Sequence, residues 1–186
     1  METQFNIKKI IELKEIQNEL DFERALIADR KLRVLSKEDP KLKIVRKKLR
    51  DLIEEYENRN WVANALIDEK KIQESDIAES IAEKERLFIE KRKVLIKSKL
   101  KNLNLNQQEF GLILGHKSKS FISELMNGIS PFSLKDLIII NRLLKIDLTE
   151  LIPTFLPQTD RIKIITSIEK LNNPKLKHRK DNFTLA

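Results

Sequence analysis

The sequence contains no cysteine, only three glycines and five prolines, and 5% aromatic residues. Without cysteine the chain can form no disulfide and carry out no thiolate chemistry, which fits a reducing cytoplasm. The scarcity of glycine, proline and aromatic residues argues against a β-sandwich, because such folds need turn residues and aromatic strands. Leucine, lysine and glutamate, which are strong helix formers, dominate instead. We therefore predict an all-α, cytoplasmic protein.

Long apolar runs are also missing. The sequence contains no stretch of 18 successive apolar residues, so we expect no membrane-spanning segment. The N-terminal segment has no uninterrupted apolar core and no small-residue cleavage site, so we expect no signal peptide. The apolar segment Leu134–Leu144 is short and interrupted by charges, and we interpret it as a buried helix.

The net charge of +8 is distributed unevenly. Residues 1–90 hold 19 Lys and Arg against 21 Asp and Glu, whereas residues 91–128 hold 8 against 2. A basic segment beside a near-neutral one is typical of a surface that binds a polyanion. Lysine-rich helices can equally be basic for solubility alone, and on charge alone the two interpretations are evenly balanced.

The N-terminal region, residues 1–75, has the pattern of a helical hairpin. An apolar stripe over Ile7–Leu35 predicts a first helix, interrupted near Asn18. Asp39 is expected to cap a second helix that has Pro40 at its first position. The short connection between them favours an antiparallel pair, for dimerisation or partner binding. Asn58–Ser75 is predicted to be a linker with a partial helix, in which Trp61 anchors the chain.

Residues 76–152 are predicted to end in four short helices, each with its own start signal. Asn106 with Glu109, Ser133 with Asp136, and Asp147 with Glu150 have the spacing of capping boxes, and Ser118 can cap the helix between the first two. Short helices are marginal alone, so a shared apolar core must hold them. Residues 153–186 form a basic extension, and we expect its segment Asn172–Ala186 to be a mobile tail.

The segment from Leu103 to Leu134 predicts two short helices, Gln107–Leu114 and about Lys119–Met126, joined by a tight turn. Gly111 lies inside the first helix, where glycine costs roughly 1 kcal/mol relative to alanine, so we expect another helix backbone to approach it closely. Gly115 and Gly128 suit left-handed turns at the two helix ends.

These residues resemble the XRE (Cro/C1-type) helix-turn-helix family over about a third of the chain. The positions that carry the resemblance are Leu105, Gln107, Phe110, Gly111, Leu114, Gly115, Ile122, Ser123, Leu125 and Gly128. The chain is one residue longer than the usual pattern between Gly115 and Ile122. The resemblance implies a C-terminal helix-turn-helix bundle that binds a palindromic double-stranded DNA operator as a homodimer.

A narrower resemblance is to HigA-type antitoxins. Ser118-Lys119-Ser120, followed later by Ser133-Leu134, resembles their DNA-reading segment, and Glu19–Leu26 and Pro40–Glu57 resemble two less specific motifs of their N-terminal half. The resemblance implies an antitoxin that neutralises a toxin, of the basic endoribonuclease kind, and represses its own operon. The acidic residues around Glu15–Glu23 and Glu54–Glu57 are then candidate toxin contacts, or else simply solvated. A stand-alone XRE-type repressor is the alternative.

The helix from Ser118 to Asn127 is expected to enter the major groove of DNA. Lys119 can donate to guanine, and Ser120 and Ser123 can pair with several base edges. Gln107 is expected to hold a phosphate at the start of the preceding helix, and Lys117, Ser118 and Asn127 to contact the backbone.

Other chemistry has little support in the sequence. It contains no glycine-rich phosphate loop, nucleophile elbow or clustered metal ligands, so we predict no enzymatic activity, cofactor or metal. His116 and His178 are isolated and suggest no zinc site. The cluster Lys91-Arg92-Lys93 could touch phosphate or simply be a solvated helix face. Glu124 is unexpected on a DNA-binding surface, where it could accept from cytosine or pair with a lysine.

Overall fold

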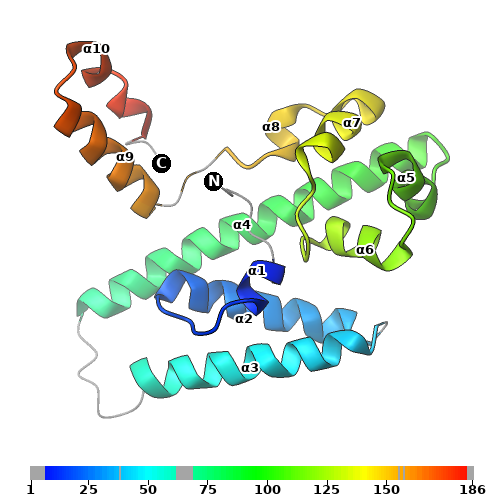
Figure 1. The fold of residues 1–186 in the computed structure, drawn as a ribbon, viewed down its shortest axis with the longest axis horizontal. Helices are drawn as coiled ribbons and strands as arrows, with labels where there is room; N and C mark the ends of the chain where they lie inside the picture. Colours follow the sequence, from blue (N-terminus) through cyan, green and yellow to red (C-terminus); the bar gives the residue numbers. More distant parts are fainter. Residues whose placement is uncertain (1–6, 38, 62–68, 155, 157, 184–186) are drawn as a thin grey trace. The chain divides into compact units, whose positions relative to one another are not determined.

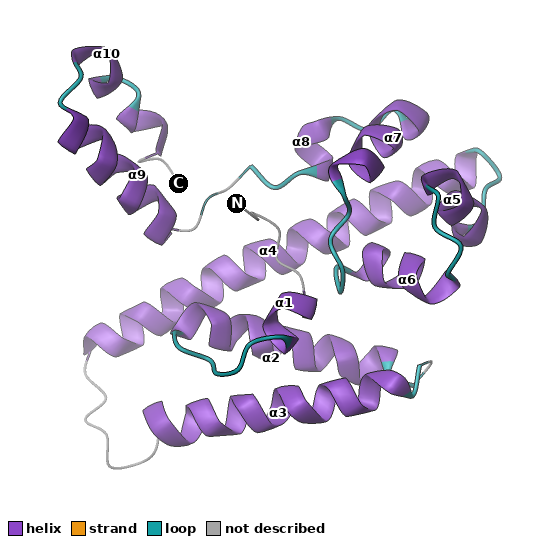
Figure 2. Ribbon diagram, viewed as in Figure 1, coloured by secondary structure: helices purple, strands orange, loops and turns teal. Residues whose placement is uncertain are grey.

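The computed structural model describes residues 7–37, 39–61, 69–154, 156 and 158–183, and every regular element among them is a helix (Figures 1 and 2). The all-α prediction is therefore confirmed. No helix of these residues is long and apolar enough to cross a bilayer. The chain divides into two compact units, Met1–Pro153 and Thr154–Ala186.

The N-terminal half of the first unit consists of α1 (Ile7–Ile11), α2 (Glu19–Leu35) and α3 (Lys41–Asn60). The predicted interruption near Asn18 is present, because the Asn18 side chain accepts the N–H of Asp21 and starts α2. Asp39 acts as a capping residue, accepting the N–H of Lys41 at 3.0 Å, and Pro40 immediately precedes α3. Helices α2 and α3 pack side by side as the expected hairpin (Figure 1).

Helix α4 (Glu69–Asn102) belongs to both halves of this unit. It packs on α2 and also on α5, α6 and α7. The predicted division between residues 75 and 76 therefore falls inside one continuous helix. The predicted linker is shorter than expected, because α3 continues to Asn60 and α4 begins at Glu69; its residues 62–68 lie outside the described ones.

The C-terminal half contains α5 (Gln107–Leu114), α6 (Lys119–Asn127), α7 (Leu134–Leu144) and α8 (Leu148–Leu151), as the four start signals predicted. Three of those signals are confirmed as caps, but the fourth prediction is wrong. Asp147 makes no side-chain capping bond, and Glu150 instead pairs with Lys91 at 3.1 Å.

Two apolar cores stabilise the first unit. The N-terminal core centres on Phe22, Leu32, Leu49 and Tyr56, with Phe22 and Tyr56 stacked 4.8 Å apart. The C-terminal core is built by α4 to α8 and consists of Ile96, Leu100, Phe110, Leu114, Ile122, Leu125, Met126, Phe132, Leu137, Ile140, Leu144, Ile146 and Leu151. The two cores therefore share no residue, although α4 packs against helices of both halves.

The second unit contains α9 (Gln158–Leu171), α10 (Pro174–Lys177) and a 3₁₀ helix at Lys180–Phe183. The sequence pattern predicted only a basic extension over residues 153–186, with a mobile tail over Asn172–Ala186. The structure instead has helical turns there, and Asn173 caps α10 by accepting the N–H of Lys175 at 3.0 Å.

A buried ion pair joins α2 to α4. The Arg24 guanidinium donates two hydrogen bonds to the Glu85 carboxylate, at 2.8 and 2.6 Å, and the Glu85 side chain is only 4% exposed. Burial lowers the pKa of Arg24, but the hydrogen bond and charge of Glu85 outweigh it, so that the pKa is raised. The pair thus fixes the register of α2 on α4.

Removing one partner should leave a buried, uncompensated charge. We expect Arg24→Ala to lower the free energy of unfolding by about 3 kcal/mol, whereas the double variant Arg24→Met, Glu85→Leu should recover most of that loss. Urea denaturation of the wild type, the single variant and the double variant measures both effects. A double variant as unstable as the single one would show that the unpaired charge is not the cause.

The crossing of α5 and α6 is tight at Gly111. A Cβ at this position would lie 2.5 Å from Cγ1 of Ile122 and 3.2 Å from the His116 carbonyl oxygen. The close approach predicted for Gly111 is thus present, but the nearest atoms belong to the Ile122 side chain rather than to a helix backbone.

Gly111→Ala should destabilise the protein although alanine is the better helix former. We expect the free energy of unfolding to fall by about 1–2 kcal/mol, because Ile122 must shift inside a packed core. Leu112→Ala is the control, since Leu112 is 59% exposed on the same helix and its truncation should change little. Denaturant unfolding distinguishes them, and equal or greater stability of Gly111→Ala would contradict a tight crossing at this position.

Candidate nucleic-acid interface

Helix α5 is fixed at both ends by local hydrogen bonds. The Asn106 side chain accepts the N–H groups of Gln108 and Glu109, each at 2.9 Å, and the Glu109 carboxylate accepts the N–H of Asn106 at 2.8 Å. This is the predicted capping box. Gly115 ends the helix in a left-handed turn, with φ +88°.

Helix α6 has equally definite ends. The Ser118 hydroxyl accepts the N–H of Phe121 at 3.2 Å, as predicted. Gly128 ends the helix with φ +69°, and a Cβ there would lie 2.9 Å from Cδ1 of Ile89 on α4. Because α6 is strongly amphipathic, Ile122 and Leu125 enter the C-terminal core and the opposite side faces outward.

The predicted DNA contacts mostly lie on this outward side. Lys117, Ser118, Lys119 and Ser120 are exposed, and Gln107 and Ser123 are half-buried. Lys117 to Ser120 continue from the turn into the first residues of α6, so they form one polar surface. The start of α6 is therefore exposed, and its Lys119 and Ser120 also line a groove shared with the N-terminal half.

Asn127 departs from the prediction. Its side chain is 8% exposed, its oxygen accepts from Nζ of Lys93 at 2.7 Å, and its amide nitrogen donates to the Ser123 carbonyl at 2.8 Å. These bonds hold the end of α6 against α4. A contact of Asn127 with the DNA backbone would require them to break, so its observed role is structural.

The basic cluster at residues 91–93 is also used internally. Lys91 pairs with Glu150, and Lys93 bonds to Asn127. Arg92 is 3% exposed and donates to the Leu151 carbonyl at 3.0 Å, and burial lowers the pKa of its guanidinium to about 10. Arg92 and Lys93 therefore join α4 to neighbouring segments, whereas Lys91 pairs with Glu150 at the surface with its side chain 70% exposed.

The turn between α5 and α6 is held by a pair that the sequence pattern did not predict. Nε2 of His116 lies 3.0 Å from the Asp136 carboxylate, which is buried and also accepts from the N–H and hydroxyl of Ser133. The His116 ring meets Phe121 edge-on at 5.0 Å. His116 thus positions the start of α6, although nothing in its sequence neighbourhood points to Asp136 as its partner.

Glu124 does not face the DNA-binding side as a free carboxylate. It accepts from the Ser130 hydroxyl at 2.9 Å and so braces the turn after α6. The described residues contain no group of three acidic, histidine or cysteine side chains that could hold a metal ion.

The N-terminal half lies directly beside α6. A groove of about 300 Å³ is lined on one side by Leu35, Asp39 and Leu42, and on the other by Lys119, Ser120, Ser123, Glu124 and Ile129. The backbone N–H groups of Ile7 and Lys8 donate to the carbonyls of Gly128 and Ile129, at 3.1 and 2.9 Å. Hydrophobic periodicity contains no signal for this packing, because it joins segments that lie far apart in the chain.

Comparison with known proteins identifies the same segment. Residues 96–151 match the family model described as helix-turn-helix, a class of DNA-binding, non-enzymatic domain. No curated protein matches the chain significantly. No solved structure does so either. The segment formed by the end of α4 and by α5 to α8 is therefore similar to helix-turn-helix domains of the XRE type, which supports a DNA-binding role.

Proposed function

We propose that the protein is a sequence-specific transcriptional repressor that reads DNA with α6. The observation that carries the proposal is the exposed N-terminal half of α6, where Lys119 and Ser120 project from a helix whose other side is fixed in the core. A helix held in this way can be placed in the major groove without rearranging its own domain.

Each contact has a physical role. The Lys119 ammonium donates to guanine O6 or N7, and the hydroxyls of Ser120 and Ser123 pair with base edges. Lys117 and Ser118 contact phosphates.

Gln107 contacts a phosphate at the other helix of the motif. Gln107 is the first residue of α5, just before the two residues whose N–H groups bond to the Asn106 side chain. In this proposal its own N–H and side chain bind a DNA phosphate at the positive end of the α5 dipole. Because of the resemblance to the XRE family, we also propose that the protein binds a palindromic operator as a homodimer.

Base contacts and phosphate contacts should respond differently to mutation. Lys119→Ala is expected to weaken binding to the preferred duplex by about 1–3 kcal/mol and to relax its sequence preference, whereas Gln107→Ala should weaken binding to all duplexes alike. Fluorescence anisotropy on a duplex selected from a random library, and on a scrambled one, separates the two effects.

Lys84→Ala is the control for loss of one positive charge, since Lys84 is exposed on α4 away from the motif. Equal loss on both duplexes for Lys119→Ala would show that Lys119 does not read bases.

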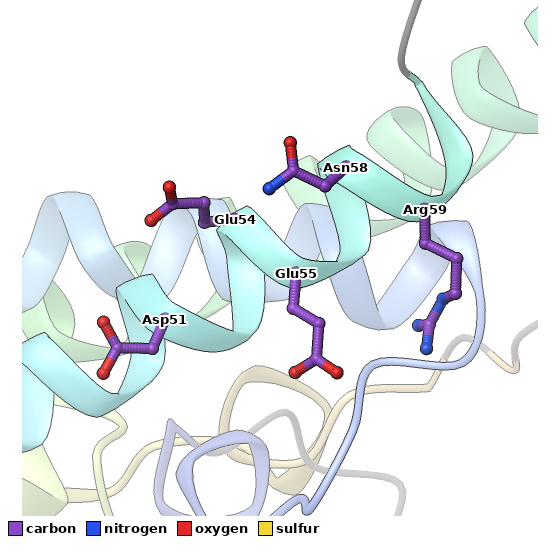
Figure 3. Close-up of a pocket in the computed structure, with 5 residues that line it drawn as sticks. All are labelled: Asp51, Glu54, Glu55, Asn58 and Arg59. Carbon is purple, nitrogen blue, oxygen red and sulfur yellow. The ribbon is translucent and has the colours of Figure 1, made fainter.

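We further propose that the repressor is an antitoxin whose N-terminal half binds a basic toxin. The four carboxylates Asp51, Glu54, Glu55 and Glu57 are all exposed on the last three turns of α3. Figure 3 shows Asp51, Glu54 and Glu55 around a shallow depression with Asn58 and Arg59. Such a surface is complementary to a cationic protein.

The other acidic stretch that we predicted as a toxin contact, Glu15–Glu23, is less accessible to a partner protein. Glu19 is 5% exposed and accepts from the Tyr56 hydroxyl at 2.9 Å and from the Trp61 indole at 3.2 Å. Asp21 pairs with Arg24, and Glu15 pairs with Arg59. These carboxylates hold the N-terminal core together, so the proposal depends on the α3 surface.

The antitoxin proposal is tested with the product of the adjacent gene. Co-expression should yield a complex and rescue growth, and Glu54→Lys with Glu55→Lys should abolish both, because the reversed charges repel a basic partner. Binding of the double variant to DNA should be unchanged. The control is Asp76→Lys with Glu79→Lys, an equal charge change at exposed positions of α4. If no neighbouring product is toxic or bound, a stand-alone repressor remains.

A further inference from the structure

Helix α3 is divided into a basic and an acidic half. Its first ten residues, Lys41–Arg50, contain six cations and no carboxylate, and its last ten, Asp51–Asn60, contain four carboxylates and one arginine. This order is the reverse of what favours an isolated helix, because acidic groups are stabilising near the N-terminus and basic groups near the C-terminus. Helix stability therefore does not explain the division.

Pairing within the protein does not explain it either. Of the six cations, Arg46 pairs with Asp29 at 2.8 Å. Lys41 and Lys43 at the start of α3, and Lys37 in the connection after α2, are exposed, and no carboxylate of the described residues forms an ion pair with any of the three. We call Lys37, Lys41 and Lys43 the hairpin-tip lysines. Their charge is available to an external anion.

The hairpin tip lies across a groove from the DNA-reading helix. The three tip residues that line the groove, Leu35, Asp39 and Leu42, are sequence neighbours of the hairpin-tip lysines, and the opposite wall includes Lys119 and Ser120. The two carboxylates of this groove each accept a hydrogen bond from a neutral group, Asp39 from the N–H of Lys41 and Glu124 from the Ser130 hydroxyl.

Backbone hydrogen bonds attach α1, at the start of the N-terminal half, to the turn that follows α6. Ile7 and Lys8 donate to the carbonyls of the turn after α6, and Ile129 from that turn is buried in the N-terminal core. This turn thus joins the N-terminal half to the end of α6, and the tip residues Leu35, Asp39 and Leu42 share a groove with its Ile129. A helix in the major groove, which is about 12 Å wide, has a phosphate strand along each side, so a basic projection beside α6 faces one of them.

We propose that the hairpin-tip lysines bind the phosphate backbone of the same duplex that α6 reads. The N-terminal half would then supply a sequence-independent part of DNA affinity, outside the helix-turn-helix domain. The inference rests on the proposed DNA-binding function and adds a second binding surface to it. It also gives the two halves of α3 different partners, nucleic acid at the basic end and a cationic protein at the acidic end.

The test uses the full chain with Lys37→Gln, Lys41→Gln and Lys43→Gln. Binding is measured by fluorescence anisotropy at several salt concentrations, on the library-selected duplex and on the scrambled one. We expect affinity for both duplexes to fall about tenfold or more. The slope of log K against log salt should decrease in magnitude by about 2–3, because each phosphate that a lysine neutralises adds about 0.9 to it. Sequence preference should be retained.

A matched variant, Lys14→Gln, Lys70→Gln and Lys84→Gln, removes the same charge at other exposed positions of the first unit and should leave the salt slope unchanged. Thermal unfolding verifies that both triple variants fold like the wild type.

Each contrary result has a different consequence for the two proposals. Wild-type slope and affinity for the tip variant would overturn the inference while leaving DNA reading by α6 intact. Tighter binding would overturn it too, because the tip would then obstruct the duplex. Failure of the wild type to bind any duplex would instead remove the proposed function.

Discussion

The placement of α6, the helix that we propose reads DNA, depends on the turn at Gly128. This residue has φ +69°, and it lies so close to Ile89 of α4 that a Cβ would come within 2.9 Å of that side chain. Its carbonyl accepts the N–H of Ile7, and the next carbonyl accepts that of Lys8. One left-handed turn thus ends α6, seats it on α4 and attaches the N-terminal segment to the helix-turn-helix domain.

The same turn makes the N-terminal half a neighbour of the proposed DNA-binding surface. The Arg24–Glu85 pair holds α2 on α4, and α4 continues into the helix-turn-helix domain without a break. A flexible linker would have let the hairpin move independently of α6. Because α4 is a single helix, a partner that binds α3 is attached to the same rigid helix that supports α6. On α3 itself, Lys41 in the basic half and Glu55 in the acidic half are about 21 Å apart, at 1.5 Å per residue.

Much of the helix-turn-helix domain could be predicted because its signals are local. Asn106 with Glu109, Ser118, Gly115 and Gly128 each specify a helix end through bonds or dihedral angles within four residues. The wrong prediction for Asp147 has a tertiary cause. Its expected partner, Glu150, is drawn to Lys91 on α4, 59 residues away, and local spacing contains no information about that competitor.

The sequence by itself determined the helical fold, the helix ends and the outward polar residues of α6, because capping and amphipathic periodicity act within a few residues. Tertiary structure decided which polar residues remain available. It buried Asn127 against Lys93, tied His116 to Asp136 and Arg92 to Leu151, and brought the basic start of α3 beside α6. Those outcomes follow from the packing of α2 and α6 on one long helix, which joins residues far apart in the chain.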